Sequence, residues 1–390
     1  PIEVPLPGAQ REAPEGSSVP EQPAAGASQQ GPLGKTGENK KKKDDNRIKA
    51  AYVTALGRIL AAALSVALTV GLALYIRDYG SGTDKAKIEP SHKGKAKLKV
   101  AGSSQESPFQ GGTYEASGVV QVPGTDSVLF VDDNRPGQVL WMQLDEAAKQ
   151  KGEIKPVDLG VRVDDPESIT YGGSFFYMAS SLSNPGANGN SLIRFVFDPS
   201  SGKVTGKPDV IEDLRTFLIN SVDELKAEGP KPAKEGGLNI EGLAWDPNRE
   251  RLLLGLRSPL PNEQALIIPV RLKDAHGAFS ADNLQVENQG IIHLSLGGLG
   301  VRDIQYDPQL RAFHVIAGEP QHHDKKTFAL WEWDGNGGRG QTPGLIQEMP
   351  LEPKMKPEGV CRVSIGQHTF VFIVGDASAY TKLDYASGDE

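Results

Sequence analysis

Short apolar segments separated by polar turns recur along the chain from about residue 116 to the C-terminus. In each recurrence a polar residue precedes a short alternating strand, and a continuous apolar strand follows. The clearest copy is residues 238–260, LNIEGLAWDPNRERLLLGLRSPL. Turn sequences such as Asp198-Pro199, Asp246-Pro247 and Asp307-Pro308 separate the strands. This pattern predicts an all-β protein and not a chain of alternating strands and helices.

The first strand of the repeat can be aligned five times. The aligned starts are Ala116-Ser117-Gly118-Val119, Pro166-Glu167-Ser168-Ile169, Ile240-Glu241-Gly242-Leu243, Arg302-Asp303-Ile304-Gln305 and Pro357-Glu358-Gly359-Val360. A second apolar strand follows each of them, at residues 127–131, 174–179, 251–256, 311–317 and 369–374. Four-stranded antiparallel sheets repeated around an axis form a β-propeller. We therefore predict a single β-propeller over residues 96–390 with five blades, or six as the alternative.

The spacing of the repeats favours five blades. The starts lie roughly 50 to 75 residues apart, at or above the usual blade length. The longest interval contains residues 211–228, where Leu214, Leu218, Val222 and Leu225 recur at helical spacing. This pattern predicts an inserted helix and not a hidden blade. The last repeat lacks a strand, and residues 97–101 form an unpaired apolar-alternating segment, so we predict that this segment completes the last blade and closes the ring.

The first 95 residues differ in composition from the rest of the chain. Residues 1–46 are rich in Pro, Gly, Gln, Ser and Glu and predict a disordered tail. Residues 59–76, ILAAALSVALTVGLALYI, contain no charged residue and at about 1.5 Å per residue approach the 30 Å of a hydrocarbon core. They predict a transmembrane helix within an anchor at residues 47–78, with a cleaved signal peptide or a buried helix as the alternatives. Residues 79–95 are expected to form a polar linker.

Charge predicts the orientation of this anchor. Basic residues precede the apolar segment, including Lys40 to Lys43, Arg47, Lys49 and Arg58. By the positive-inside rule the N-terminus is then cytoplasmic, and the propeller is periplasmic or extracellular. The lipid bilayer is the first expected partner, through residues 59–76. The formal net charge of −8 argues against nucleic acid as a partner.

The repeated polar position is the main candidate site. The first strand of each blade lines the central channel, so the alignment brings together Ser117, Glu167, Glu241, Asp303 and Glu358. Facing carboxylates raise one another's pKa unless a cation intervenes, and a ring of oxygen ligands suits calcium. The residues therefore predict a central calcium ion or, as the alternative, a structural ring in which the carboxylates accept backbone N–H bonds or pair with arginines. Arg257 and Arg302 are the candidate ligand-binding residues, suited to an anion.

Three stretches carry a resemblance to a known family. Residues 239–243 with 254–259, residues 301–304 and residues 357–361 resemble a bacterial family called domain of unknown function 3616. The resemblance runs from about Ser117 to the C-terminus and implies a secreted or anchored propeller. More distantly, the strand starts are similar to those of phytase-like esterases, and the Ser/Glu ring is similar to that of calcium-dependent apyrases. The apyrase likeness implies calcium ligands at Ser117, Glu167, Glu241 and Glu358, whereas Asp303 departs from it in residue type.

The sequence is consistent with two functions. The first is a membrane-anchored binding module that recognises a ligand or an envelope protein, with any calcium ion structural. The second is a calcium-dependent phosphoester hydrolase, with the ion polarising a phosphoryl oxygen. The acidic ring favours the hydrolase. The histidines, however, show no paired motif that would provide a base, and no Gly-x-Ser-x-Gly motif is present. We therefore favour the binding module.

Overall fold

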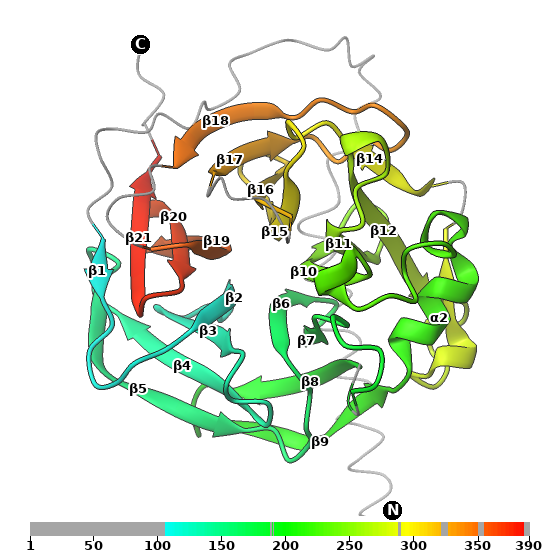
Figure 1. The fold of residues 1–390 in the computed structure, drawn as a ribbon. Coiled ribbons are helices and arrows are strands. Elements are labelled where there is room, and N and C mark those ends of the chain that lie inside the picture. The colour runs from blue at the N-terminus through cyan, green and yellow to red at the C-terminus, as the bar shows by residue number, and fades with distance from the viewer. Residues whose placement is uncertain are drawn as a thin grey trace, which may run out of the picture. The chain divides into compact units, whose positions relative to one another are not determined.

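The computed structural model describes residues 106–385, apart from residues 188, 190, 288–289, 321–326 and 350–354. These residues form five antiparallel sheets arranged around a central axis, as Figure 1 shows. The all-β propeller predicted from the repeats is confirmed, and it has five blades.

Each blade runs outward from an inner strand that lines the channel. Blade 1 contains β2 (Ala116–Gln121), β3 (Ser127–Asp132), β4 (Gln138–Leu144) and β5 (Gln150–Asp158). Blade 2 contains β6 (Pro166–Gly172), β7 (Phe175–Ser180), β8 (Leu192–Asp198) and β9 (Lys203–Ile211). Blade 3 contains β10 (Asn239–Asp246), β11 (Arg251–Ser258), β12 (Ala265–Leu272) and β13 (Leu284–Val286), and β14 (Ile292–Leu294) also pairs with β12. Blade 4 contains β15 (Gly300–Asp307), β16 (Ala312–Gly318), β17 (Phe328–Trp333) and β18 (Gly344–Met349).

Blade 5 joins the two ends of the described chain. It contains β19 (Pro357–Ile365), β20 (His368–Gly375), β21 (Ala379–Asp384) and, as its outermost strand, β1 (Ser107–Pro108). Phe109, the next residue, stacks its ring on Phe130 at 5.2 Å between centroids and so ties this strand to blade 1. Ring closure by an N-terminal strand is thus as predicted, but residues 107–108 provide it. Residues 97–101, to which the sequence assigned this strand, lie outside the described residues.

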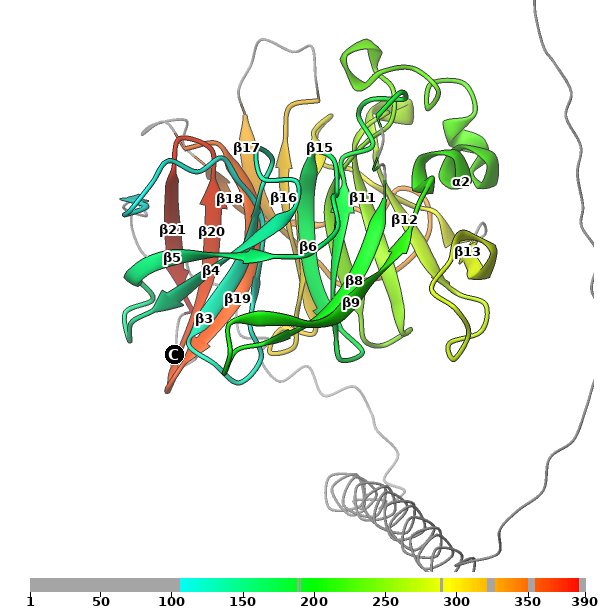
Figure 2. The ribbon, with the colours of Figure 1, turned by 90° about the horizontal axis from the view of Figure 1, so that it is seen from below.

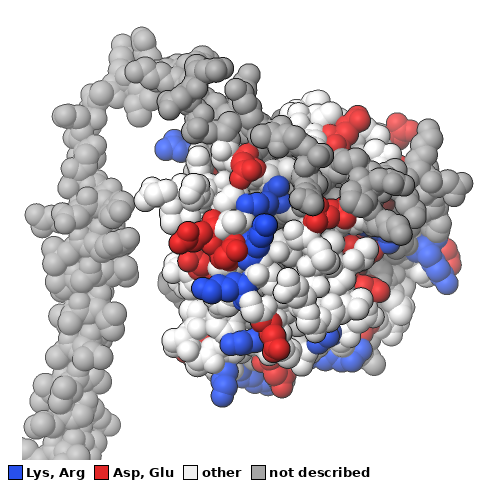
Figure 3. Space-filling view, turned by 90° about the vertical axis from the view of Figure 1, so that its left-hand side faces the viewer, with Lys and Arg blue, Asp and Glu red and all other residues white. Residues whose placement is uncertain are grey.

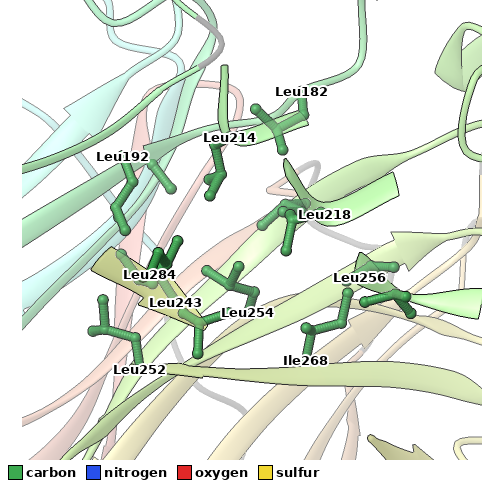
Figure 4. Packing of buried hydrophobic residues seen from close by; sticks show 14 of the residues in the cluster. Leu182, Leu192, Leu214, Leu218, Leu243, Leu252, Leu254, Leu256, Ile268 and Leu284 are labelled. Carbon is green, nitrogen blue, oxygen red and sulfur yellow. The ribbon is translucent and has the colours of Figure 1, made fainter. Parts of the chain in front are cut away.

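The insertion between blades 2 and 3 contains the predicted helix. α2 (Leu214–Ser221) is followed by the short 3₁₀ helices η1 (Asp223–Leu225) and η2 (Ala233–Glu235), and it lies beside blade 3 in Figure 2. Its spacing of apolar residues places Leu214 and Leu218 on one face. Figure 4 shows both side chains in the cluster that also contains Leu182 and Leu256. The cluster fixes the insertion on the outer side of the blades.

A buried arginine ties this insertion to its surroundings. Arg215 is only 5% exposed, and its guanidinium donates to four backbone carbonyls, those of Leu182, Gly229, Lys231 and Leu238. Burying a charge without hydrogen-bond partners is costly, and the four carbonyl acceptors offset this cost for the Arg215 guanidinium. The loops around α2 are therefore held in place, and they form one wall of a pocket described below.

A β-bulge near the start of each inner strand positions the channel residues. In blade 3, Ile240 pairs with Leu256 and Gly242 pairs with Gly255, which leaves Glu241 unpaired between them. The same one-residue shift in register occurs in the inner strand of every other blade, and in blade 1 it falls within Ser117-Gly118, of which only Ser117 has a side chain to present. A bulge leaves one extra residue outside the ladder and redirects its side chain. Each blade therefore presents one bulge residue at the same end of the channel.

The predictions for the N-terminal region fall on residues that the structure does not describe. The tail at residues 1–46, the anchor at 47–78 and the linker at 79–95 all lie in this part. Between residues 106 and 385, no described helix is long and apolar enough to cross a membrane. The transmembrane segment at residues 59–76 and the topology derived from it therefore stay predictions.

Candidate functional site

The bulge residues form a ring that differs from the predicted one in a single blade. They are Ser117, Glu167, Glu241, Arg302 and Glu358. The sequence alignment placed Asp303 at this position because it matched acidic residues with one another. In the structure Val301 pairs with Ala317 and Asp303 pairs with Ile316, so the unpaired residue of blade 4 is Arg302. The ring therefore contains its own cation.

Arg302 joins the carboxylates of the two neighbouring blades. Its guanidinium lies 2.9 Å from Glu241 Oε2 and also contacts Glu358 Oε2. All three side chains are at least 93% buried. Two buried carboxylates next to each other would repel, and the guanidinium between them offsets this repulsion. Arg302 thus connects blades 3, 4 and 5 through charge.

Glu241 has two further partners on its own blade. Its Oε1 accepts hydrogen bonds from Asn239 Nδ2 at 3.0 Å and from Arg257 Nη1 at 2.9 Å. Arg257 also donates from Nε to the backbone carbonyl of Glu319 at 3.0 Å. The predicted ligand-binding arginines, Arg257 and Arg302, are thus both paired with Glu241. Their role in binding an anion stays a prediction.

Asp303 is not the ring residue that the sequence predicted; it binds backbone amides. It is fully buried, and its oxygens accept backbone N–H bonds from Ile304 at 2.8 Å and from Val360 at 2.7 Å. Burial raises the pKa of this carboxyl well above its usual range, although the backbone hydrogen bonds act in the opposite direction. Asp303 therefore links the inner strands of blades 4 and 5 and is not one of the ring residues.

Glu167 is an acidic ring residue whose protonation is perturbed by its surroundings. Burial raises its pKa well above the usual range, and the negative charges of Glu241 and Asp165 add to this rise. Arg302 and a hydrogen bond with Ser117 lower it, but they do not outweigh the other causes. Glu167 therefore holds a proton to higher pH than an ordinary glutamate does.

The ring residues present do not match the predicted set of calcium ligands. A calcium site needs several oxygens converging on one point. Here the Arg302 guanidinium occupies the position between Glu241 and Glu358, and Asp303 is bonded to backbone amides. No group of three or more His, Cys, Asp or Glu suited to a metal ion occurs among the described residues. A calcium ion bound by Ser117, Glu167, Glu241, Asp303 and Glu358 stays a prediction.

The same end of the channel carries further acidic residues from blades 1, 2 and 5. Burial raises the pKa of Asp133 to about 7, and the charges of Glu115, Asp132, Asp165 and Asp376 add to the effect. Nearby cations are already paired, with Arg135 Nε 3.3 Å from Asp132 and Lys356 Nζ 2.7 Å from Asp376. The channel mouth is therefore acidic on this side.

This raised pKa gives a first testable prediction. A carboxyl that binds its proton more tightly in the folded state loses stability as pH rises from its unfolded pKa of about 4 to the folded value. Asp133→Asn should thus unfold at a higher temperature than the wild type at pH 8, and at about the same temperature at pH 4. We expect a gain on the order of 1 kcal/mol at pH 8, because the side chain keeps some exposed surface and solvent screens the repulsion.

The measurement is thermal unfolding of both proteins between pH 4 and pH 8. Asp126→Asn is a suitable control, because it removes a carboxyl from a turn of the same blade that is not among the charges acting on Asp133. Equal stabilities of wild type and Asp133→Asn across this range would show that the carboxyl is not perturbed.

A pocket of about 580 Å³ lies beside this channel mouth, between blades 3 and 4 and the α2 insertion. Its apolar walls include Pro259, Leu260 and Leu299. Its described lining residues include four glutamates, Glu224, Glu228, Glu263 and Glu319. No Lys, Arg or His occurs among these described lining residues. Arg257 connects the pocket to the ring, because it binds both Glu241 and the backbone of Glu319.

The four glutamates differ in how far their charge is already compensated. Glu228 binds Lys231 at 2.6 Å, and Glu224 lies 3.7 Å from His293 and 3.6 Å from Arg339. Glu263 and Glu319 form no side-chain ion pair with any described residue. Negative charge therefore remains available on the side of the pocket formed by these two residues.

One side of the propeller, away from this pocket, has a mixed charge distribution. Figure 3 shows the side of the propeller where β1, β5 and β21 lie, and there Lys and Arg side chains lie among those of Asp and Glu. Among the described residues, apolar walls with several glutamates thus distinguish the pocket from this side of the surface.

This pocket was not predicted from the sequence. Its residues come from segments far apart in the chain, at 224–236, 258–263, 297–299 and 319–320. One local signal was present, since Pro259, Pro261, Gly297 and Gly298 mark two irregular loops. In the first loop, Asn262 and Glu263 both have left-handed backbone conformations, with φ of 55° and 60°. Such strain in non-glycine residues often accompanies binding sites.

Comparison with protein families gives one match. A sequence model of the family described as "Protein of unknown function (DUF3616)" matches residues 214–383, from α2 through most of β21. The resemblance to this family expected from the sequence is confirmed over this range, which covers blades 3 to 5. No curated protein matches the chain.

Solved structures provide similarities at the level of the fold. A putative gluconolactonase is 11% identical, with a TM-score of 0.40, over 75% of this chain and 96% of that one. A family AA12 carbohydrate-active enzyme from Trichoderma reesei is 9% identical, with a TM-score of 0.41, over 78% and 100%. A glucose dehydrogenase is 10% identical, with a TM-score of 0.38, over 73% and 100%. Likenesses this distant carry no argument about activity.

Proposed function

We propose that the protein is a binding module that captures a cationic group, an ammonium or a guanidinium, in the acidic pocket between blades 3 and 4. The observation that carries this proposal is a pocket of about 580 Å³ whose described lining residues include four glutamates and no basic residue. The predicted membrane anchor at residues 59–76 and the extracytoplasmic location remain parts of the same proposal.

The size and walls of the pocket support a ligand larger than a bare ion. Pockets of 300–1,000 Å³ are typical of sites for organic ligands, and most combine apolar walls with a few polar groups. Leu260, Leu299 and the prolines would pack against the carbon chain of such a ligand, as they would against the methylene groups of lysine. Glu263 and Glu319 would then pair with its charged end.

The charge pattern of the channel supports binding over phosphoester hydrolysis. A hydrolase would need free cations to hold the phosphate, and Arg257 and Arg302 are already paired with Glu241. An acidic pocket next to the channel would also repel a phosphate ester. We therefore propose a binding module and not a phosphoester hydrolase.

The test is a calorimetric titration of the full-length protein with two probes, spermidine and a short peptide with two lysines. The double variant Glu263→Gln/Glu319→Gln should weaken binding of both probes by tenfold or more, which corresponds to about 1.4 kcal/mol. The affinity of the wild type should fall as salt is raised from 50 to 300 mM, since the proposed contacts are electrostatic.

The control variant is Glu153→Gln, which removes an exposed glutamate on β5 at the outer edge of blade 1. It should leave both affinities unchanged. Acetylating the lysines of the peptide should abolish its binding. Equal affinity of the acetylated and free peptides, or of the double variant and the wild type, would overturn the proposal.

A further inference from the structure

A second pocket, of about 290 Å³, lies between blades 2 and 3 at the other end of the channel. Trp245 lines it from the last-but-one position of β10, whereas the bulge residue Glu241 is near the start of that strand. At roughly 3.3 Å per residue the two positions are about 13 Å apart along β10. The pocket is therefore separate from the acidic pocket and from the ring.

Aromatic side chains form most of its walls. Phe175, Tyr177, Trp245 and Phe279 all line it. The rings of Tyr177 and Trp245 are nearly parallel, with an interplanar angle of 3° and centroids 6.0 Å apart. Phe175 and Trp245 are only partly buried, so parts of their rings face the pocket. Such rings bind flat apolar groups by stacking or by edge contacts.

The position of Trp245 is fixed by a glycine. A Cβ atom at Gly172 would lie 2.0 Å from the indole ring, so the absence of a side chain there makes room for it. The ring of Tyr177 is buried and stacks on the indole ring of Trp245. The aromatic wall is thus formed before any ligand arrives, which lowers the entropic cost of binding.

The charged lining residues are mainly basic. Arg194, Arg251 and Arg271 line the pocket, and Glu250 is the one carboxylate among the described lining residues. Arg194 is held between the rings of Phe175 and Phe279, with its guanidinium carbon 4.7 and 4.6 Å from their centroids.

The second and third arginines are not equally available. Arg251 is 95% buried and is held by Asp246 and Glu287. Arg271 shares Glu287 through its Nε at 3.2 Å and is 49% exposed. A guanidinium has five N–H donors, so Arg271 keeps others for a ligand.

We propose that this pocket binds a planar aromatic carboxylate. The aromatic ring would lie against Phe175 and Trp245, and the carboxylate would accept hydrogen bonds from Arg271 at the rim. A volume of about 290 Å³ accommodates one or two fused rings with a short acidic substituent. The combination of aromatic walls and an accessible guanidinium distinguishes this ligand class from an aliphatic acid and from an aromatic amine.

The test measures binding of three probes to the full-length protein by calorimetry. They are naphthalene-2-carboxylate, naphthalene-2-methylamine and cyclohexanecarboxylate. The first should bind at least tenfold more tightly than either of the others. Phe175→Leu should weaken naphthalene-2-carboxylate about tenfold, because it removes one aromatic wall. Arg271→Gln should reduce the preference for the carboxylate over the amine by a similar factor.

Arg162→Gln is the matched control, because Arg162 is also an exposed, ion-paired arginine but does not line the pocket. It should leave the affinity and the preference as in the wild type. Each variant should keep the wild-type melting temperature within about 3 °C. If Phe175→Leu does not, Phe175→Tyr is measured in its place; because it keeps an aromatic ring, it should bind naphthalene-2-carboxylate nearly as tightly as the wild type. Comparable binding of all three probes, or no saturable binding of the first below 5 mM, would overturn the proposal.

Discussion

Replacing Arg302 with Gln should destabilise the propeller more than any other single change to a charged residue of the ring. The substitution leaves Glu241 and Glu358 buried without the guanidinium that lies between them. Removing one partner of a buried ion pair costs about 3–5 kcal/mol, since the remaining charge stays away from water. Unfolding in urea at pH 7.5 should show this loss.

The pH dependence of this variant separates the charge effect from a general loss of packing. Without Arg302 the two carboxylates should have raised pKa values in the folded state, so protonation at pH 5 should recover part of the lost stability. A second substitution, Glu358→Gln, should recover part of it at pH 7.5, because it removes one of the two charges. A loss that is the same at pH 5 and pH 7.5, with no recovery in the double variant, would contradict the role assigned to Arg302.

Adding a single methyl group at Gly359 should have a similar effect. A Cβ atom there would lie 2.3 Å from the backbone oxygen of Ser117 and 3.0 Å from the amide nitrogen of Val119. These atoms belong to the inner strand of blade 1, which cannot move without opening the ring. Overpacking of this kind costs typically 1–3 kcal/mol and occasionally more, and we expect about 3 kcal/mol for Gly359→Ala.

The matched control is Gly344→Ala in β18, where the nearest atom to an added Cβ is 3.9 Å away. That change should leave stability unchanged or raise it slightly, because alanine restricts the unfolded chain. The two variants should be compared by their urea midpoints under the same conditions. A shift in Gly359→Ala no larger than that in Gly344→Ala would show that blades 5 and 1 are not in tight contact at this point.

The same close approach explains why the repeat could be recognised from the sequence. Gly118 and Gly242 occupy positions equivalent to Gly359, and a Cβ atom at either would also lie within 3 Å of the next inner strand. The acidic residue before the glycine is the bulge residue, whose side chain faces the channel. The close approach of neighbouring inner strands thus requires glycine at one position, and this requirement is visible in the sequence as a repeated polar-Gly pair. The five blades, most of their strands and α2 could therefore be predicted.

The ring could be predicted only in part. In blade 4 the repeat carries Asp303 where other blades have glycine or serine, so matching by residue type shifted the alignment by one position. Only the strand pairing, with Val301 opposite Ala317, shows that Arg302 is the bulge residue. Pairing between strands is not visible in the composition of one strand, and a shift of one residue turns a side chain to the other face.

The closing strand and the two pockets could not be predicted for related reasons. β1 is two residues long, too short for an alternating pattern to show. The pockets combine loops and strand ends from residues more than 90 positions apart, such as Glu224 with Glu319 and Phe175 with Phe279. Contacts of this kind depend on how the blades are arranged, which follows from the whole fold.

The short closing strand also determines how the propeller should respond to mechanical load. Force transmitted along the segment that precedes residue 106 acts first on β1, which pairs with β21 only through Ser107 with Tyr380 and Pro108 with Ala379. The next points of resistance are the ring contacts of Phe109 with Phe130 and Tyr380. Under tension from its N-terminal side, the domain should peel at blade 5 before any other blade unravels, while blades 2 and 3 keep their hydrophobic cluster. We therefore expect the pairing of β1 with β21 to be the first contact of the propeller to yield under such a load.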